Sequence, residues 1–134
     1  MSKKQITTGG IADPITISGP TLVKSREPTT APTISAGALT LNLSTAQTFL
    51  VSLNANITSI TISNVPSDSN VLVGFTLILT ADGTVRTITW PASFKWAGGV
   101  APTLSSVNTK RDVFSFCTTD NGTTWLGFVG GQGY

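Results

Sequence analysis

The chain has 134 residues, a formal net charge of +2 and no histidine, and only 10% of its residues are charged. This length predicts one folded domain, and the lack of histidine removes the commonest general base together with every catalytic triad that uses one. An ordinary soluble domain carries about 25% charged residues, so a surface this poor in charge suits a protein that is packed in an assembly.

The positive charge is concentrated near the N-terminus. Residues 1–27 contain four cationic and two acidic side chains, whereas four of each sign cancel in the remainder. No stripe of Lys and Arg with interleaved aromatic residues is present, so nucleic acid is not an expected partner. No apolar run approaches the roughly 18 residues of a membrane span, and the polar residues after Lys4 are unlike an export signal.

Residues 1–36 predict an extended N-terminal arm, because glycine and proline are too frequent there for regular structure. The arm contains short apolar patches and four cationic side chains, so we expect it to dock on a partner, with strand addition to a neighbouring sheet as one means. The predicted partner-binding residues are Lys3, Lys4, Ile15, Ile17, Leu22, Lys24 and Arg26. Residues 37–134 form the predicted body.

Alternating apolar residues begin at Ala38 and predict half-buried strands. They are Leu39, Leu41 and Leu43, then Phe49, Val51 and Leu53, and then Ile57, Ile60 and Ile62. We expect the first two groups to pair with each other. The three-residue step after Ile57 predicts a bulge near Thr58 and Ser59.

The stretch from Val71 to Thr80 is apolar on both parities, which predicts a central strand covered on both faces. Asp82-Gly83 follows it and predicts a tight hairpin into a strand that carries Arg86, Ile88 and Trp90 on one face.

Two of the three tryptophans lie in the stretch from Thr84 to Gly99, which reads as a strand, a corner at Pro91 and a return through Phe94 and Trp96. We expect this corner to be the heaviest part of the core. The alternative is an aromatic platform that binds a sugar or a receptor.

The stretch from Val100 to Lys110 is a predicted surface loop, with Leu104 and Val107 pointing inward. The segments Asp112 to Thr118 and Thr124 to Val129 then predict a hairpin, and Gly130 to Tyr134 a flexible tail. Asp112 is expected to form an ion pair with Lys110 or Arg111 at the start of the strand.

No segment has a helical period, so the predicted fold is all-β, a β-sandwich or jelly-roll-like body with an extended N-terminal arm. Cys117 is the only cysteine, which excludes an internal disulfide, and its strand context predicts a small buried hydrophobe.

The carboxylates do not predict an active site. Asp68, Asp82 and Asp120 lie in predicted turns, where aspartate is favoured for its backbone hydrogen bonds. No phosphate-binding glycine-rich loop and no calcium-loop spacing is present. We therefore expect no enzyme activity, no cofactor and no metal site.

Four segments of the body resemble a module of tailed-bacteriophage virions, found in head-decoration (cement) proteins and in the knob domains of tail fibres. They are residues 39–44 (LTLNLS), 53–66 (LNANITSITISNVP), 84–104 (TVRTITWPASFKWAGGVAPTL) and 112–133. The run WPASFKWAGGVAPTL, residues 90–104, is the most specific part. The resemblance implies a β-sandwich, in most cases a homotrimer, with a structural or attachment role.

In long fibre proteins this module follows shafts and linkers, so a chain with only a short arm before it favours a decoration protein. The expected partners are then the major capsid protein and further copies of the chain, with no nucleic acid and no membrane. The expected location is the outer surface of the virion head, after synthesis in the host cytoplasm. A tail-fibre or receptor-binding knob and a non-viral carbohydrate-binding domain are the alternatives.

Overall fold

The computed structural model describes residues 26–134. The all-β prediction is confirmed: within these residues the regular structure is eight strands and one 3-10 turn, η1. The strands are β1 (Thr29–Thr30), β2 (Ala38–Asn42), β3 (Thr48–Leu53), β4 (Ser59–Ser63), β5 (Val73–Ala81), β6 (Phe94–Trp96), β7 (Arg111–Thr118) and β8 (Trp125–Gly131), and η1 is Ala97–Gly99.

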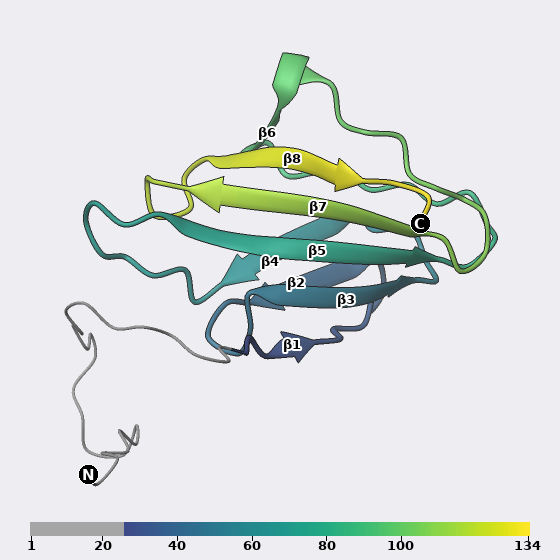
Figure 1. Ribbon diagram of the computed structural model, residues 1–134, viewed down its shortest axis with the longest axis horizontal. Coiled ribbons are helices and arrows are strands. Elements are labelled where there is room, and N and C mark those ends of the chain that lie inside the picture. Colours follow the sequence, from purple (N-terminus) through teal and green to yellow (C-terminus); the bar gives the residue numbers. More distant parts are fainter. Residues whose placement is uncertain (1–25) are drawn as a thin grey trace, which may run out of the picture.

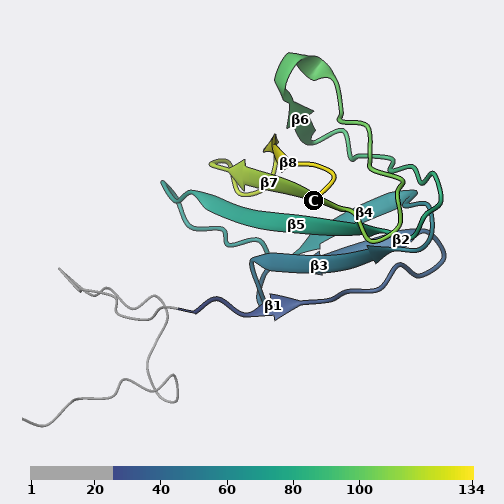
Figure 2. The same cartoon turned by 45° about the vertical axis from the view of Figure 1, so that its right-hand side comes forward.

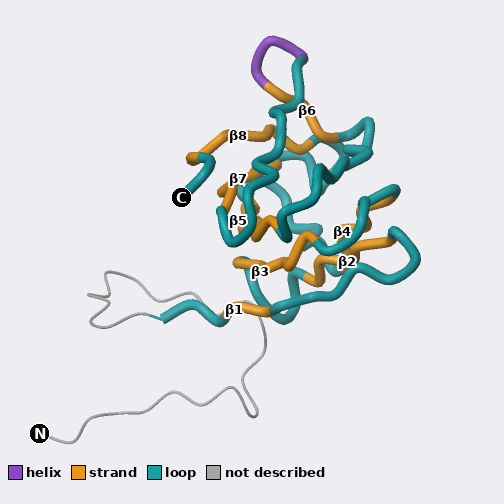
Figure 3. Tube along the Cα trace, turned by 90° about the vertical axis from the view of Figure 1, so that its right-hand side faces the viewer, coloured by secondary structure: helices purple, strands orange, loops and turns teal. Residues whose placement is uncertain are grey.

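The strands form a six-stranded sheet in the order β1-β3-β5-β7-β8-β6 and a two-stranded sheet of β2 and β4 (Figure 1). The small sheet lies on one face of the large sheet (Figure 3). From β1 to β5 the chain passes from one sheet to the other with each strand. Successive strands of one sheet are therefore parallel, as in the pairs β1–β3, β3–β5 and β2–β4.

The core lies between the two sheets and follows the alternation of the sequence. In β5 every odd-numbered residue from Val73 to Ala81 is buried, and the even-numbered residues are half-buried. The buried hydrophobic side chains of the core are Leu39, Leu41, Ala46, Phe49, Val51, Leu53, Ile57, Val73, Phe75, Leu77, Leu79, Phe94, Phe114, Phe116 and Trp125. The predicted inward faces of β2 and β3 are thus confirmed.

The predicted pairing of β2 with β3 is wrong. The faces were assigned correctly, but the loop between them crosses from the small sheet to the large one, where β3 pairs with β1 and β5. A five-residue loop fits a hairpin or a crossing between layers equally well, and the alternation does not distinguish them.

The predicted hairpin at Asp82-Gly83 is also wrong. Gly83 has the positive φ that a turn needs, at 89°, but β5 pairs with β3 and β7, and residues 84–90 form no strand. Residues 84–90 make a single β-bridge, a parallel one between Ile88 and Ile57. The bulge predicted near Thr58 and Ser59 is confirmed, because the N–H groups of both residues donate to the Gly37 carbonyl, at 2.8 and 3.2 Å.

The hairpin of β7 and β8 is confirmed, with antiparallel pairing on either side of the turn at residues 119–124. The predicted flexible tail is wrong. Strand β8 continues to Gly131, and Tyr134 exchanges two backbone hydrogen bonds with Arg111, each 3.1 Å long.

Three smaller expectations also differ. Val107 is 64% exposed and does not point inward, whereas Leu104 packs against the core. Cys117 is half-buried because it lies on the outer face of β7. The described part of the predicted arm includes β1, which pairs with β3 at the edge of the large sheet, and Ile34, which packs against the core (Figure 2).

Candidate partner-binding surface

The aromatic corner packs against the core. Phe94 in β6 lies opposite Trp125 in β8, and its ring centroid is 4.7 Å from that of Phe116. The rings of Trp90 and Trp96 meet edge to face at 5.0 Å, and both also contact Phe116. These contacts favour core packing over a solvent-facing aromatic platform.

Trp96 is only half-buried, and its inner face lies on Gly127 of β8. A Cβ atom at residue 127 would come within 2.9 Å of the Trp96 ring, so glycine is needed for this close approach. The Trp96 indole N–H is buried without a hydrogen-bond partner among the described residues.

An apolar groove of about 520 Å³ runs between β8 and the segment from Trp96 to Thr103. Its lining residues are Trp96, Ala97, Val100, Ala101, Pro102, Thr103, Gly127, Phe128 and Val129, and none of them is charged. Val100 is 75% exposed and Phe128 is 53% exposed. Large apolar side chains gathered in this way, without charges, are typical of a surface that binds a partner.

Asp112 holds the loop beside this groove in place. Its side chain, in a residue only 2% exposed, accepts hydrogen bonds from the Ser105 backbone N–H at 2.7 Å and the Ser105 hydroxyl at 2.6 Å. The Gly133 N–H donates to it at 3.1 Å, and the Gln132 side chain donates to the Thr103 carbonyl at 2.6 Å. The loop and the C-terminal residues are therefore tied to β7 at one point.

The predicted ion pair of Asp112 with Lys110 or Arg111 is wrong, because the carboxylate points inward and its neighbours are exposed. The sequence contained a signal for this: Asp112 has the same parity as Phe114 and Phe116. A polar residue on the buried face of a strand needs hydrogen-bond partners, and the adjacent loop and tail supply them.

Two of the three turn carboxylates, Asp82 and Asp120, accept hydrogen bonds from nearby backbone, as expected for aspartate in turns. Asp82 accepts a hydrogen bond from the Thr84 N–H at 3.0 Å and forms an ion pair of 2.6 Å with Arg86. The Arg86 guanidinium holds the pKa of Asp82 below its usual value.

Asp120 accepts hydrogen bonds from the Thr124 N–H at 2.8 Å and the Thr118 hydroxyl at 2.7 Å, and these lower its pKa.

Across residues 26–134, no three His, Cys, Asp or Glu side chains gather as metal ligands would. The same stretch contains no helix with the length and apolarity of a membrane span.

Of the predicted partner-binding residues, Arg26 is exposed at the start of the described chain. Lys3, Lys4, Ile15, Ile17, Leu22 and Lys24 lie outside the described residues. The sequence prediction missed the groove, because its lining comes from two segments that are distant in sequence, residues 96–103 and residues 127–129 of β8.

Comparisons of the chain with family models, with curated proteins and with solved structures found no match. The resemblance to phage virion modules therefore stays a prediction.

Proposed function

We propose that the protein is a structural protein of a tailed-phage virion, a decoration (cement) protein that binds the outer surface of the head and stabilises the shell of the major capsid protein. The observation that carries the proposal is the apolar groove, an uncharged surface with exposed Val100 and Phe128 in a chain that is poor in charge. Such a surface gains free energy when a partner covers it, at about 25 cal/mol for each Å² of apolar area.

The proposal includes the β-sandwich architecture. Leu39 and Leu41 of β2 share one core with Phe49 and Leu77 of the large sheet, which supports two layers packed face to face. A jelly roll fits less well, because its strands are antiparallel and four of the pairs here are parallel.

The arm contributes to the same attachment. Lys3, Lys4, Lys24 and Arg26 give it four positive charges, and we propose that they draw the chain to acidic capsid surface. No enzyme activity, cofactor or metal forms part of this function. At the outer surface of the head, the proposed partners are the major capsid protein and further copies of the chain. Nucleic acid and membrane are not proposed partners.

A matched pair of substitutions tests the proposal. Val100 and Val85 are 75% and 78% exposed, but only Val100 lines the groove. Val100→Asp should weaken binding to heads that lack the protein by at least about tenfold, since a charge would be buried without a partner. Val85→Asp should bind like the wild type.

Binding is measured by co-sedimentation of the purified variants with heads, and the denaturant midpoints of both variants show that they fold. Equal binding by the two variants would contradict the groove as the contact. Binding to tails or to host glycans, with none to heads, would instead favour the receptor-binding knob.

A further inference from the structure

In the small sheet, the edge of β4 that faces away from β2 is unpaired among residues 26–134, and it borders a pocket. In the parallel ladder with β2, Ser59 donates to Gly37 at 3.2 Å and Ser63 accepts from Leu43 at 3.0 Å, so the odd-numbered residues of β4 face β2. The backbone N–H and C=O groups of Ile60 and Ile62 therefore point the other way, and no backbone group among residues 26–134 bonds to them. A free strand edge of this kind is a template for another strand.

Residues 87–89 of the chain pair with Ile57, just before β4, but the chain does not continue along the edge of β4. Ile57 exchanges hydrogen bonds with Thr87 and Thr89, at 2.9 and 2.8 Å, as a third strand of the small sheet would. At Pro91 the chain turns away toward β6, because proline cannot donate to the ladder.

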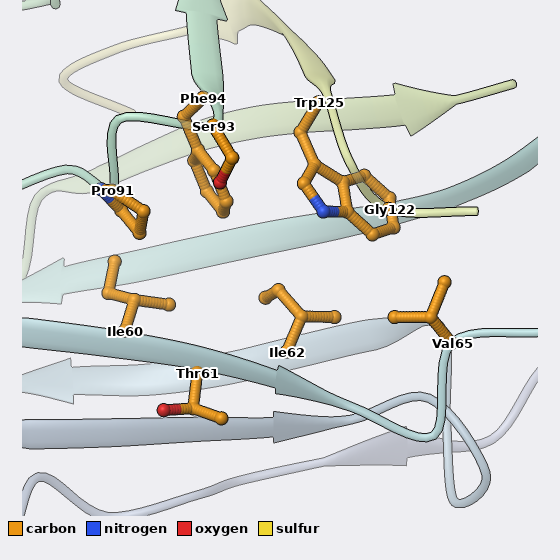
Figure 4. Close-up of a pocket in the computed structure, with 9 residues that line it drawn as sticks. All are labelled: Ile60, Thr61, Ile62, Val65, Pro91, Ser93, Phe94, Gly122 and Trp125. Carbon is orange, nitrogen blue, oxygen red and sulfur yellow. The ribbon is translucent and has the colours of Figure 1, made fainter. Parts of the chain in front are cut away.

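The space that is left is a pocket of about 270 Å³ beside β4. Ile60, Ile62 and Val65 lie on one side of it, and Pro91, Phe94 and Trp125 face them from the other side (Figure 4). An added strand with apolar side chains at alternate positions would extend the small sheet and place those side chains over Phe94 and Trp125.

One segment of the chain outside the described residues repeats four of the five residues of β4. Residues 15–18 read Ile-Thr-Ile-Ser, identical to Ile60-Thr61-Ile62-Ser63. In β4 the two isoleucines face the core and Thr61 is exposed. A strand with the same alternation would put Ile15 and Ile17 into the pocket and leave Thr16 and Ser18 in water.

We propose that residues 15–18 of a second copy add as a strand to the free edge of β4 and fill this pocket, which links neighbouring copies of the chain. The argument for a second copy is the short length of chain that joins residues 15–18 to the described residues of the same copy. Eight peptide steps (26 − 18) join Ser18 to Arg26 and span at most about 29 Å when fully extended. About 20–24 Å of the large sheet and a perpendicular layer of about 10 Å separate β1 from the strands that face the pocket, a straight path of about 22–26 Å. Residues 26–28 lie on the side of β1 away from the small sheet (Figure 3), so the chain's own segment would have to turn back and be almost fully extended.

The proposal reassigns Ile15 and Ile17 from capsid contacts to contacts between copies. It stands apart from capsid binding, and its test contains no capsid. Failure of the test would leave the groove and its head-binding experiment unaffected.

Hydrogen exchange at the Ile60 and Ile62 amides tests the docking directly. The acceptor is the full-length, isotopically labelled double variant Ile15→Asp/Ile17→Asp, whose own segment no longer suits the pocket. Unlabelled wild type mixed with it should slow exchange at these two amides by about tenfold or more. The Thr61 amide, which faces β2, should not change.

The matched control donor carries the same two charges on the opposite parity. Unlabelled Thr16→Asp/Ser18→Asp should protect the acceptor as wild type does, whereas unlabelled Ile15→Asp/Ile17→Asp should not. A wild-type donor that gives no protection would overturn the proposal. In that case, labelled wild type is measured without a donor. Slower exchange at its Ile60 and Ile62 amides than in the acceptor variant would show that each chain fills its own pocket. Equal exchange in the two would show that the segment does not dock.

Discussion

At the scale of single residues, Asp112 has the largest structural role of any carboxylate in residues 26–134. It joins three parts of the chain: strand β7, the preceding loop at Ser105 and the tail at Gly133. A buried carboxylate that accepts several hydrogen bonds is stable only while its donors stay in place. The loop beside the apolar groove and the C-terminus should therefore loosen together.

We predict that Asp112→Ala lowers the free energy of unfolding by about 3 kcal/mol, because it leaves the Ser105 and Gly133 N–H groups without an acceptor. Asp112→Asn should cost less, since it keeps one acceptor oxygen. Urea unfolding measures both changes, and amide exchange at Ser105 and Gly133 should accelerate more than exchange in β5. Asp68→Ala is the control, because no hydrogen bond among the described residues involves that side chain. A loss for Asp112→Ala no greater than that of the control would show that the contact is not stabilising.

The turn at Asp120 predicts a pH dependence. Hydrogen bonds from the Thr124 N–H and the Thr118 hydroxyl lower the pKa of Asp120 from 3.8 in the folded protein. A lowered folded pKa stabilises the fold above the unfolded pKa, and this stabilisation is lost as the pH falls through the folded value. Stability should therefore decline below about pH 4. The decline in urea midpoint from pH 5 to pH 2.5 should be smaller for Asp120→Asn than for wild type, and an equal decline would contradict the assignment.

At the scale of elements, the close contact of β6 with β8 depends on Gly127. We predict that Gly127→Ala costs about 1–3 kcal/mol, because the added methyl group would overlap the rings of Trp96 and Phe116. The neighbouring Phe128→Ala should change stability little, since its side chain is half-exposed on the opposite face. Thermal unfolding compares the two, and the near-ultraviolet circular dichroism of the tryptophans should change only for Gly127→Ala. If Gly127→Ala melts like wild type, the corner is looser than its contacts indicate.

The faces of the strands could be predicted from the sequence, but most of their partners could not. Alternation fixes which side of β2 or β3 meets the core, because the side-chain period of a strand is two residues. It carries no information on which strand lies beside it. The β7–β8 hairpin was predicted correctly because Asp120-Asn121-Gly122 is a local turn signal. Asp82-Gly83 gave a similar signal and misled, since the parallel β3 and the antiparallel β7 already occupy both edges of β5.

The candidate binding surface was hidden from the sequence for a related reason. Val100 and Phe128 are 28 residues apart (128 − 100), and they line one groove because β6 pairs with β8. Likewise, the tail appeared flexible because its glycines have no side chains to pack, whereas its order comes from hydrogen bonds to Asp112 and Arg111. Contacts of this kind between distant segments leave no periodic pattern.

At the scale of the whole molecule, the charges divide the chain into a cationic N-terminal segment and a neutral body. Long-range attraction to an acidic capsid surface would then act mainly on the N-terminal segment and would be screened by salt beyond about 10 Å at 0.1 M ionic strength. Apolar contacts of the groove should be much less sensitive to salt. The N-terminal charges should therefore affect mainly the rate of association, and the groove mainly the lifetime of the complex.

We predict that Lys3→Ala/Lys4→Ala/Lys24→Ala slows association with phage heads by about tenfold at low salt and has little effect on the dissociation rate, because steering charges act on the encounter. The matched control, Lys95→Ala/Lys110→Ala/Arg111→Ala, removes three positive charges from the body, all of them on exposed residues. Surface plasmon resonance on immobilised heads at two salt concentrations measures both rates, and the difference between the variants should disappear at high salt. Equal slowing by both triple variants would mean that net charge matters and the N-terminal position does not. No slowing by either would leave the groove as the contact that determines both rates.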